Sequence, residues 1–287
     1  MINSGNGKAL YQITKLVRQY LTRDLAPPAL PPVATVSSQL KQHYEGYYQA
    51  ISPREQWLHG FKRLVKMQKL VFATDALSTS NYGLHRERWL LMSERLFRKE
   101  DQSVATLALL PDAGGETLIQ SSFGQMGLGT YKKVSALRVW AQVVAIALVS
   151  FLVLSSLFFA PVWIWRKLSG KLHNAGPLSV RIMPLLGAIS LVSFDVLFVS
   201  GLRGGITACF VDDVVTLGTP SLFAVGIMFS SIAFPSAGAA SLYVLYHERS
   251  AAMNRVVYWH SVLVTAALLG VAIYMGYWGL IGLRLWV

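Results

Sequence analysis

The chain has 287 residues, of which 53% are hydrophobic and only 14% are charged, and its mean hydropathy is +0.44. These values are high for a soluble domain of this length, so they indicate a membrane protein. The net charge of +12 comes without an arginine-rich arm or a basic stripe interleaved with aromatic residues, which excludes the usual sequence pattern of nucleic-acid binders.

Charged residues divide the chain into two regions. Residues 1–137 contain 17 basic and 10 acidic residues, whereas residues 138–287 contain 9 and 4. We therefore expect an α+β membrane protein, in which an N-terminal helix and a small β-rich domain precede a four-helix transmembrane bundle.

The first predicted element is an amphipathic helix over residues 8–23. Its apolar residues recur at the three- and four-residue spacing of one helix face: Leu10, Ile13, Leu16, Val17 and Leu21. The helix follows a turn at 4–7, before which Met1 and Ile2 are expected to end a strand. Residues 1–25 thus predict a terminal strand, turn and helix, and we expect the apolar face of this helix to be exposed.

A proline-rich linker and a β-rich domain are expected next. Residues 26–38 contain four prolines, which favour an extended connection between domains. From 39 to 134 the pattern is mainly strand-like, with strands at 70–74 and 88–92 and a hairpin from 103 to 121 around the PDAGG turn. Bulky apolar residues are too few for a large core, so this domain is expected to be small.

Four long apolar segments follow Arg138, at about 140–163, 183–202, 221–246 and 258–282. Each is long enough to cross about 30 Å of hydrocarbon as a helix, which predicts a transmembrane domain over 138–287. Aromatic residues suited to the head-group region lie at their ends: Trp140, Trp163, Trp165, Tyr258, Trp259 and Trp278. The third segment is rich in small residues, which predict close helix packing: Ser230, Ser231, Ser236, Ala237, Gly238, Ala239, Ala240 and Ser241.

Loop charges predict the orientation of these segments. Cations mark the loops after the first and third segments: Arg166, Lys167, Lys171, Arg181, Arg249 and Arg255. The intervening loop holds Asp212 and Asp213, so the two basic loops are expected in the cytoplasm and residues 1–137 outside it. A cytoplasmic N-terminal region stays open, because residues 132–138 add three cations on the other side of the first segment and no secretory signal is present.

Several motifs combine in one order along the chain. MINSGNGKALYQITKLVRQYL has the form of strand, turn and helix, HYEGYYQ holds Tyr44, Gly46 and Tyr48, LFRKED holds Phe97 and Arg98, and the end reads YWGLIG from Tyr277. Together they resemble the C-terminal region of membrane-bound serine β-lactamase-like hydrolases, the CubicO group related to class C β-lactamases and penicillin-binding proteins. The sequence departs from that pattern at 92–95, where MSER stands in place of a Pro-Val-Gly-like turn.

The resemblance implies a protein of the bacterial inner membrane, with residues 1–137 in the periplasm if an upstream signal exists. It also implies that the catalytic residues of the family lie upstream of residue 1. That family uses Ser-x-x-Lys, Tyr-x-Asn or Ser-x-Asn, and Lys-Thr-Gly or His-x-Gly motifs. Residues 38–41 match the first and residues 4–6 the second, but neither is joined by the remaining motifs. We therefore assign no catalytic residue to this chain.

No cofactor or metal is expected either. The chain has one cysteine, Cys209, so an intrachain disulfide and a multi-cysteine metal site are both excluded. The sequence contains no HExxH motif, no P-loop and no cluster of cysteine and histidine residues.

Asp195 and His260 are the candidate polar contact within the apolar segments. Asp195 lies midway along the second segment, where a carboxylate costs about 3 kcal/mol or more unless a partner or water faces it. His260 lies near the start of the fourth segment and is one possible partner, and Arg203 is another. A transport or ligand site at Asp195 and an interfacial anchor at His260 are the alternatives.

Three functions compete. In the first, the chain is the membrane-anchoring and accessory region of a β-lactamase-related serine hydrolase, non-catalytic as it stands, and its partners are the lipid bilayer and a β-lactamase-like catalytic domain or chain. The second is a stand-alone four-helix membrane protein that binds a partner protein. The third, a small transporter, has less support because no inverted repeat or broken-helix pattern is visible. The apolar residues retained in the first helix favour the first function.

Overall fold

The computed structural model describes residues 7–26, 29–52, 59–82, 84–111, 114–122, 129–171, 176–201, 217–251, 253–282 and 284. The chain separates into two compact units, Lys8–Val143 and Val144–Val287. We call them the barrel unit and the helical unit. Within the described residues they contain eight strands and seven helices, which confirms an α+β protein with four long apolar helices.

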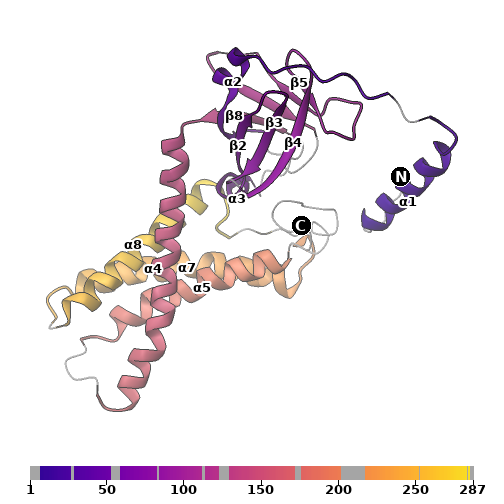
Figure 1. Cartoon of the computed structure of the whole chain (residues 1–287). Coiled ribbons are helices and arrows are strands. Elements are labelled where there is room, and N and C mark those ends of the chain that lie inside the picture. Colours follow the sequence, from indigo (N-terminus) through magenta and orange to yellow (C-terminus); the bar gives the residue numbers. More distant parts are fainter. Residues whose placement is uncertain are drawn as a thin grey trace. The chain divides into compact units, whose positions relative to one another are not determined.

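The β-rich domain is a closed, eight-stranded antiparallel barrel (Figure 1). Its strands are β1 (Gly46–Ala50), β2 (Met67–Phe72), β3 (Ala76–Asn81), β4 (Leu84–Ser93), β5 (Leu96–Arg98), β6 (Leu107–Leu109), β7 (Leu118–Ser121) and β8 (Gly129–Val134). Each strand pairs with the next along the chain, and β8 returns to pair with β1. The predicted strands at 70–74 and 88–92 correspond to β2 and β4, and the predicted hairpin is β6 and β7. Closure matters because it leaves no strand with an unpaired edge.

Side chains fill the centre of the barrel. Its core consists of Tyr44, Tyr48, Leu70, Phe72, Leu77, Trp89, Leu91, Phe97, Leu107, Leu109, Ile119 and Tyr131. Two buried polar groups of this core form hydrogen bonds: the Trp89 indole Nε1 donates to Thr79 Oγ1 at 2.9 Å, and the Tyr48 hydroxyl donates to the Tyr44 carbonyl at 2.8 Å. A barrel of eight strands is just wide enough for side chains to fill it, as they do here.

Short helices and the proline-rich segment surround the barrel. Helix α2 (Ser38–Tyr44) begins after Ser37, whose hydroxyl accepts the Leu40 amide, and helix α3 (His59–Val65) lies between β1 and β2. The described part of the segment before α2 is extended and packs on the barrel. The Ala34 amide donates to the Leu91 carbonyl at 2.8 Å, and the Val36 amide donates to the Thr74 carbonyl at 3.0 Å.

The first apolar helix starts within the barrel unit. Helix α4 (Ala136–Leu168) buries Val139 and directs Gln142 at the end of α3. The Gln142 side-chain nitrogen lies 3.1 Å from the carbonyl oxygens of Arg63 and Leu64, and the Tyr82 hydroxyl donates to the Leu64 carbonyl at 2.6 Å. These bonds satisfy carbonyls that the end of a helix leaves without internal partners, and they fix the first turns of α4 to the barrel.

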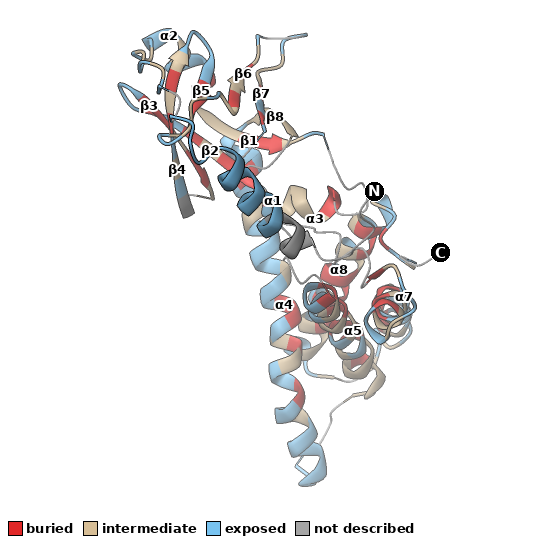
Figure 2. Ribbon diagram, turned by 90° about the vertical axis from the view of Figure 1, so that its right-hand side faces the viewer, coloured by how far each residue is buried: buried red, intermediate tan, exposed pale blue. Residues whose placement is uncertain are grey.

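The helical unit contains four helices that are long and apolar enough to cross a membrane. They are α4 beyond Val143, α5 (Ser179–Gly201), α7 (Leu222–His247) and α8 (Arg255–Tyr277), which confirms the four predicted segments as helices. Helices α5, α7 and α8 pack on one another, and α4 crosses them rather than lying alongside (Figures 1 and 2). The fourth helix ends at Tyr277, so residues 278–282 of the predicted segment are outside it.

Small residues permit the close packing of α5, α7 and α8, as expected from the third segment. A Cβ atom at Gly187 of α5 would lie 2.6 Å from Leu268 Cδ1 of α8, which is closer than real Cβ atoms come. Between α7 and α8 the hydroxyls of Ser241 and Thr265 are 2.6 Å apart. Small residues therefore let these helices approach and form an interhelical hydrogen bond at the contact.

Candidate functional site

The apolar face of α1 (Gly7–Leu21) is the strongest candidate for a binding surface. Side chains of this face have large exposed fractions: Ile13 57%, Leu16 64%, Val17 51%, Tyr20 65% and Leu21 70%. Figure 2 shows α1 exposed along its described length. The expected exposure of Ile13 and Val17 is confirmed, whereas the side chain of Leu10 lies outside the described residues, as do Met1 and Ile2.

Sequence alone explains why this face forms. The five residues fall at positions i, i+3, i+4, i+7 and i+8, so a helix of 3.6 residues per turn puts them on one side. Lys15 and Arg18 lie on the other side. A short helix that packs on nothing is marginal in water, because most helical stability in proteins comes from burying the apolar face. The α1 face therefore has the form of a docking surface.

Two motifs that carry the family resemblance have structural roles in the barrel. Tyr44 and Tyr48 are both in the core, and the Tyr44 hydroxyl also donates to the Leu110 carbonyl at 2.6 Å. Between them, Gly46 has a φ of +143° and a Cβ there would lie 3.0 Å from Lys133 Cε. Glycine is suited to both the backbone conformation and the close approach.

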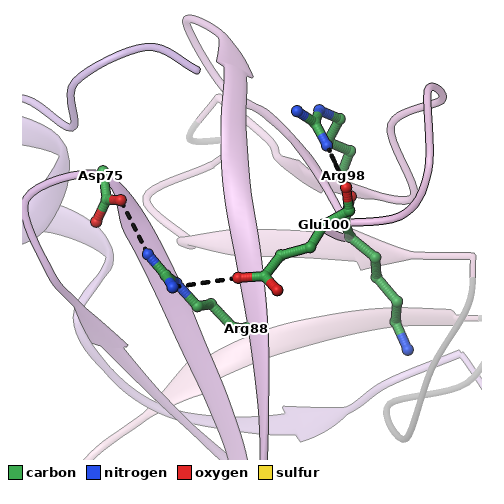
Figure 3. A network of polar contacts seen from close by, with 5 residues as sticks. Asp75, Arg88, Arg98 and Glu100 are labelled. Carbon is green, nitrogen blue, oxygen red and sulfur yellow. Dashed lines mark hydrogen bonds and ion pairs between the residues drawn. The ribbon is translucent and has the colours of Figure 1, made fainter. Parts of the chain in front are cut away.

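Phe97 and Arg98 are also built into the barrel. Phe97 is fully buried, and Arg98 is only 3% exposed although it carries a charge. Its Nη1 donates to the carbonyls of Lys99, Glu100 and Gln102, and its Nη2 donates to the Pro31 carbonyl at 3.0 Å. Figure 3 shows Arg98 against the backbone of Glu100, whose carboxylate binds Arg88. Arg98 thus holds the β5–β6 connection and the proline-rich segment together.

His260 lies in a contact between two helices, whereas Asp195 is exposed. His260 of α8 lies 2.8 Å from the Ser155 hydroxyl of α4, measured from Nε2, and its ring is 5.4 Å from that of Phe159. Asp195 is exposed on α5. In the part of the chain that the structure describes, no hydrogen bond joins Asp195 to His260, so their contact stays a prediction. Arg203, Asp212 and Cys209 lie outside the described residues.

The described residues offer no assembled catalytic or metal centre. Ser38 and Lys41 are both exposed on the short helix α2, whose N-cap is Ser37, and residues 4–6 lie outside the described part. No group of three or more metal-ligating side chains occurs among the residues that the structure describes.

Burial shifts the pKa values of two side chains in the barrel unit, His59 and Tyr131. Burial lowers the pKa of His59, and the nearby charges of Arg63 and Lys62 lower it further. Burial in the barrel core raises the pKa of Tyr131 to about 12. Both groups are therefore neutral near pH 7.

Sequence reasoning missed the contacts that Arg98, Gln142 and Ser155 make. Each is a polar residue that directly follows an apolar one, and this weak pattern is the only sign of these contacts in the sequence. Comparison of the chain with family models, with curated proteins and with solved structures found no match.

Proposed function

We propose that this chain is the membrane-anchoring, accessory region of a β-lactamase-related serine hydrolase, and that the apolar face of α1 binds the catalytic domain. The exposed α1 face carries the proposal. Fully burying a large apolar side chain stabilises by about 1.5–3 kcal/mol, so burying the exposed half of five such residues contributes roughly 5 kcal/mol before ordering costs. That contribution suits a helix docked on a neighbouring domain.

The barrel unit supports a non-catalytic role. Its interior is filled by aromatic and aliphatic side chains, and the Tyr44, Gly46, Tyr48, Phe97 and Arg98 motif residues maintain the barrel. A barrel fastened to the first turns of α4 is suited to connecting a catalytic domain to the membrane anchor.

The four apolar helices supply the anchor. We place them in the bacterial inner membrane, with the barrel unit on the periplasmic side, because cations gather in and beside the α4–α5 and α7–α8 connections: Arg166, Lys167, Lys171, Arg249 and Arg255. A Cβ atom at Gly176 would lie 2.7 Å from the Cβ of Met253, so these two connections approach each other at one end of the helical unit. Both would then face the cytoplasm, which agrees with the excess of cations at this end.

The test uses the full chain, isolated in mild detergent from membranes of its own bacterium and treated with a fluorescent penicillin. A β-lactamase-like serine hydrolase forms a labelled acyl-enzyme, whose size on a gel shows whether it is the same polypeptide or a separate chain. Expected is a labelled band with the native sequence. The double variant Ile13→Asp with Val17→Asp is expected to weaken docking of the catalytic domain. If that domain is a separate chain, it no longer co-purifies with the variant. If both are one polypeptide, the variant loses its labelling at a lower temperature than the native protein does.

The matched control is Gln12→Asp with Gln19→Asp, which adds the same charge to the polar side of α1. This variant is expected to behave as the native chain. Equal effects of the two variants would overturn the proposal. The absence of a labelled protein from the preparation of the native chain would overturn it as well.

A further inference from the structure

A cavity of about 390 Å³ opens among α4, α5 and α8 at the end of the helical unit that carries the α4–α5 and α7–α8 connections. Its volume falls in the range of about 300–1,000 Å³ typical of ligand sites. Apolar side chains form much of its wall: Phe159, Val162, Trp163, Pro184, Val256 and Val257. An apolar cavity of this size accepts a hydrocarbon portion of a ligand.

Three cations line the same cavity. Arg166 comes from the last turn of α4, Lys171 from the connection that follows, and Arg181 from the first turn of α5. The described lining includes no carboxylate. Arg166 and Arg181 are close enough for their charges to repel each other. An anion between them would remove this repulsion, and a guanidinium fork fits phosphate oxygens in pairs.

Neutral hydrogen-bonding groups complete the site. The hydroxyls of Ser156 and Ser261 belong to buried residues, and Asn254 and His260 also line the cavity. His260 is held against α4 through Ser155, so its ring has a defined position. The cavity thus has cations at the helix ends, and hydroxyls and apolar groups deeper along the helices. This arrangement suits a ligand that is anionic at one end and apolar at the other.

We propose that this cavity binds the phosphate head group of an anionic amphiphile, with the adjoining part of its acyl chain against the apolar wall. Basic pockets between membrane helices on the cytoplasmic side recognise such head groups. The proposal is independent of the hydrolase partner of α1, because it concerns residues of the helical unit alone. Inorganic phosphate shares the anionic chemistry, and the test separates the two sources.

The experiment measures dissociation constants by native mass spectrometry of the full chain in a neutral detergent. Phosphatidylglycerol is titrated against phosphatidylcholine, and inorganic phosphate is added as a competitor. We expect phosphatidylglycerol to bind at least tenfold more tightly than phosphatidylcholine. Replacing both Arg166 and Arg181 with glutamine is expected to weaken phosphatidylglycerol binding about thirtyfold, from the usual contribution of two cations near a lipid head group.

The matched control replaces Lys167 and Arg249 with glutamine. It removes one cation from the last turn of α4 and one from the α7–α8 connection, but neither residue lines the cavity. Binding within about twofold of the native value is expected for the control, because these cations do not face the ligand. Equal losses in the two double variants would show a surface-charge effect only, and would overturn the proposal.

A second variant tests the cavity without changing charge. Val257→Trp fills the apolar wall and leaves all three cations in place, so it is expected to weaken phosphatidylglycerol binding as well. Circular dichroism verifies the helices of each variant. Native binding by Val257→Trp, equal affinity for the two lipids, or displacement of phosphatidylglycerol by equimolar inorganic phosphate would each refute an amphiphile site.

Discussion

Replacing Arg98 with alanine is expected to release the proline-rich segment from the barrel. Arg98 is almost completely buried and donates to four backbone carbonyls, one of them in Pro31 and the others in the β5–β6 connection. Alanine leaves these acceptors without a donor. The amides of Ala34 and Val36 lie in the same proline-rich segment as Pro31 and should become less protected from hydrogen exchange.

The size of the effect follows from the hydrogen bonds. Two nitrogens, Nη1 and Nη2, carry the four bonds, so they count as about two independent contacts. A hydrogen bond to a charged group contributes about 1.5–3 kcal/mol. Because water replaces the donor at some carbonyls in the variant, we expect a net loss of about 3 kcal/mol, at the lower end of that range for two bonds.

Hydrogen exchange of the full chain in neutral detergent measures this loss. If opening of the segment limits exchange, about 3 kcal/mol corresponds to exchange roughly 150-fold faster at Ala34 and Val36. Arg88→Ala is the matched control. Arg88 pairs with Asp75 at 2.9 Å and with Glu100 at 3.1 Å, but its side chain is 53% exposed. Exposed pairs contribute about 1 kcal/mol or less, so the control should exchange at most about fivefold faster.

Equal exchange in the two variants would refute the reasoning, because the difference in burial would then have no energetic consequence. The same conclusion would follow if Arg98→Ala changed exchange only within the β5–β6 connection. In that case the bond to Pro31 would contribute little, and other contacts would hold the proline-rich segment on the barrel.

Three further perturbations test the barrel. The free energy of unfolding of the barrel is expected to fall as the pH drops below about 6.5, because the lowered pKa of His59 means that the unfolded chain binds the proton more strongly. In His59→Gln, the free energy of unfolding measured with urea should depend less on pH. An unchanged pH dependence would contradict this role of His59. Gly46→Ala should destabilise the protein by about 2 kcal/mol, because Gly46 has a positive φ and the added Cβ would approach Lys133. The control Gly270→Ala adds a Cβ with no atom nearby and should not destabilise it. Equal melting temperatures of the two variants would contradict the prediction. Thr79→Val removes the acceptor of the buried Trp89 indole and should cost about 1–3 kcal/mol in urea unfolding, while Thr79→Ser, which keeps the hydroxyl, should cost less.

Local patterns in the sequence determined α1, the four long apolar helices and part of the barrel, but not the short helices α2 and α3. Four apolar segments became α4, α5, α7 and α8, because a long apolar run has few alternatives to a helix. The spacing of Ile13, Leu16 and Val17 determined which side of α1 is apolar. The hairpin of β6 and β7 was predictable because its strands adjoin a Gly-rich turn.

Only the tertiary structure decided how distant segments meet. Barrel closure pairs β1 at residues 46–50 with β8 at residues 129–134, and no local pattern encodes such a pairing. Likewise, Arg98 finds Pro31, and Arg166, Lys171 and Arg181 line one cavity, only after helices and strands have packed. Periodicity along the chain specifies which face of an element is apolar, whereas the partner of that face depends on register, connection geometry and packing over long sequence separations.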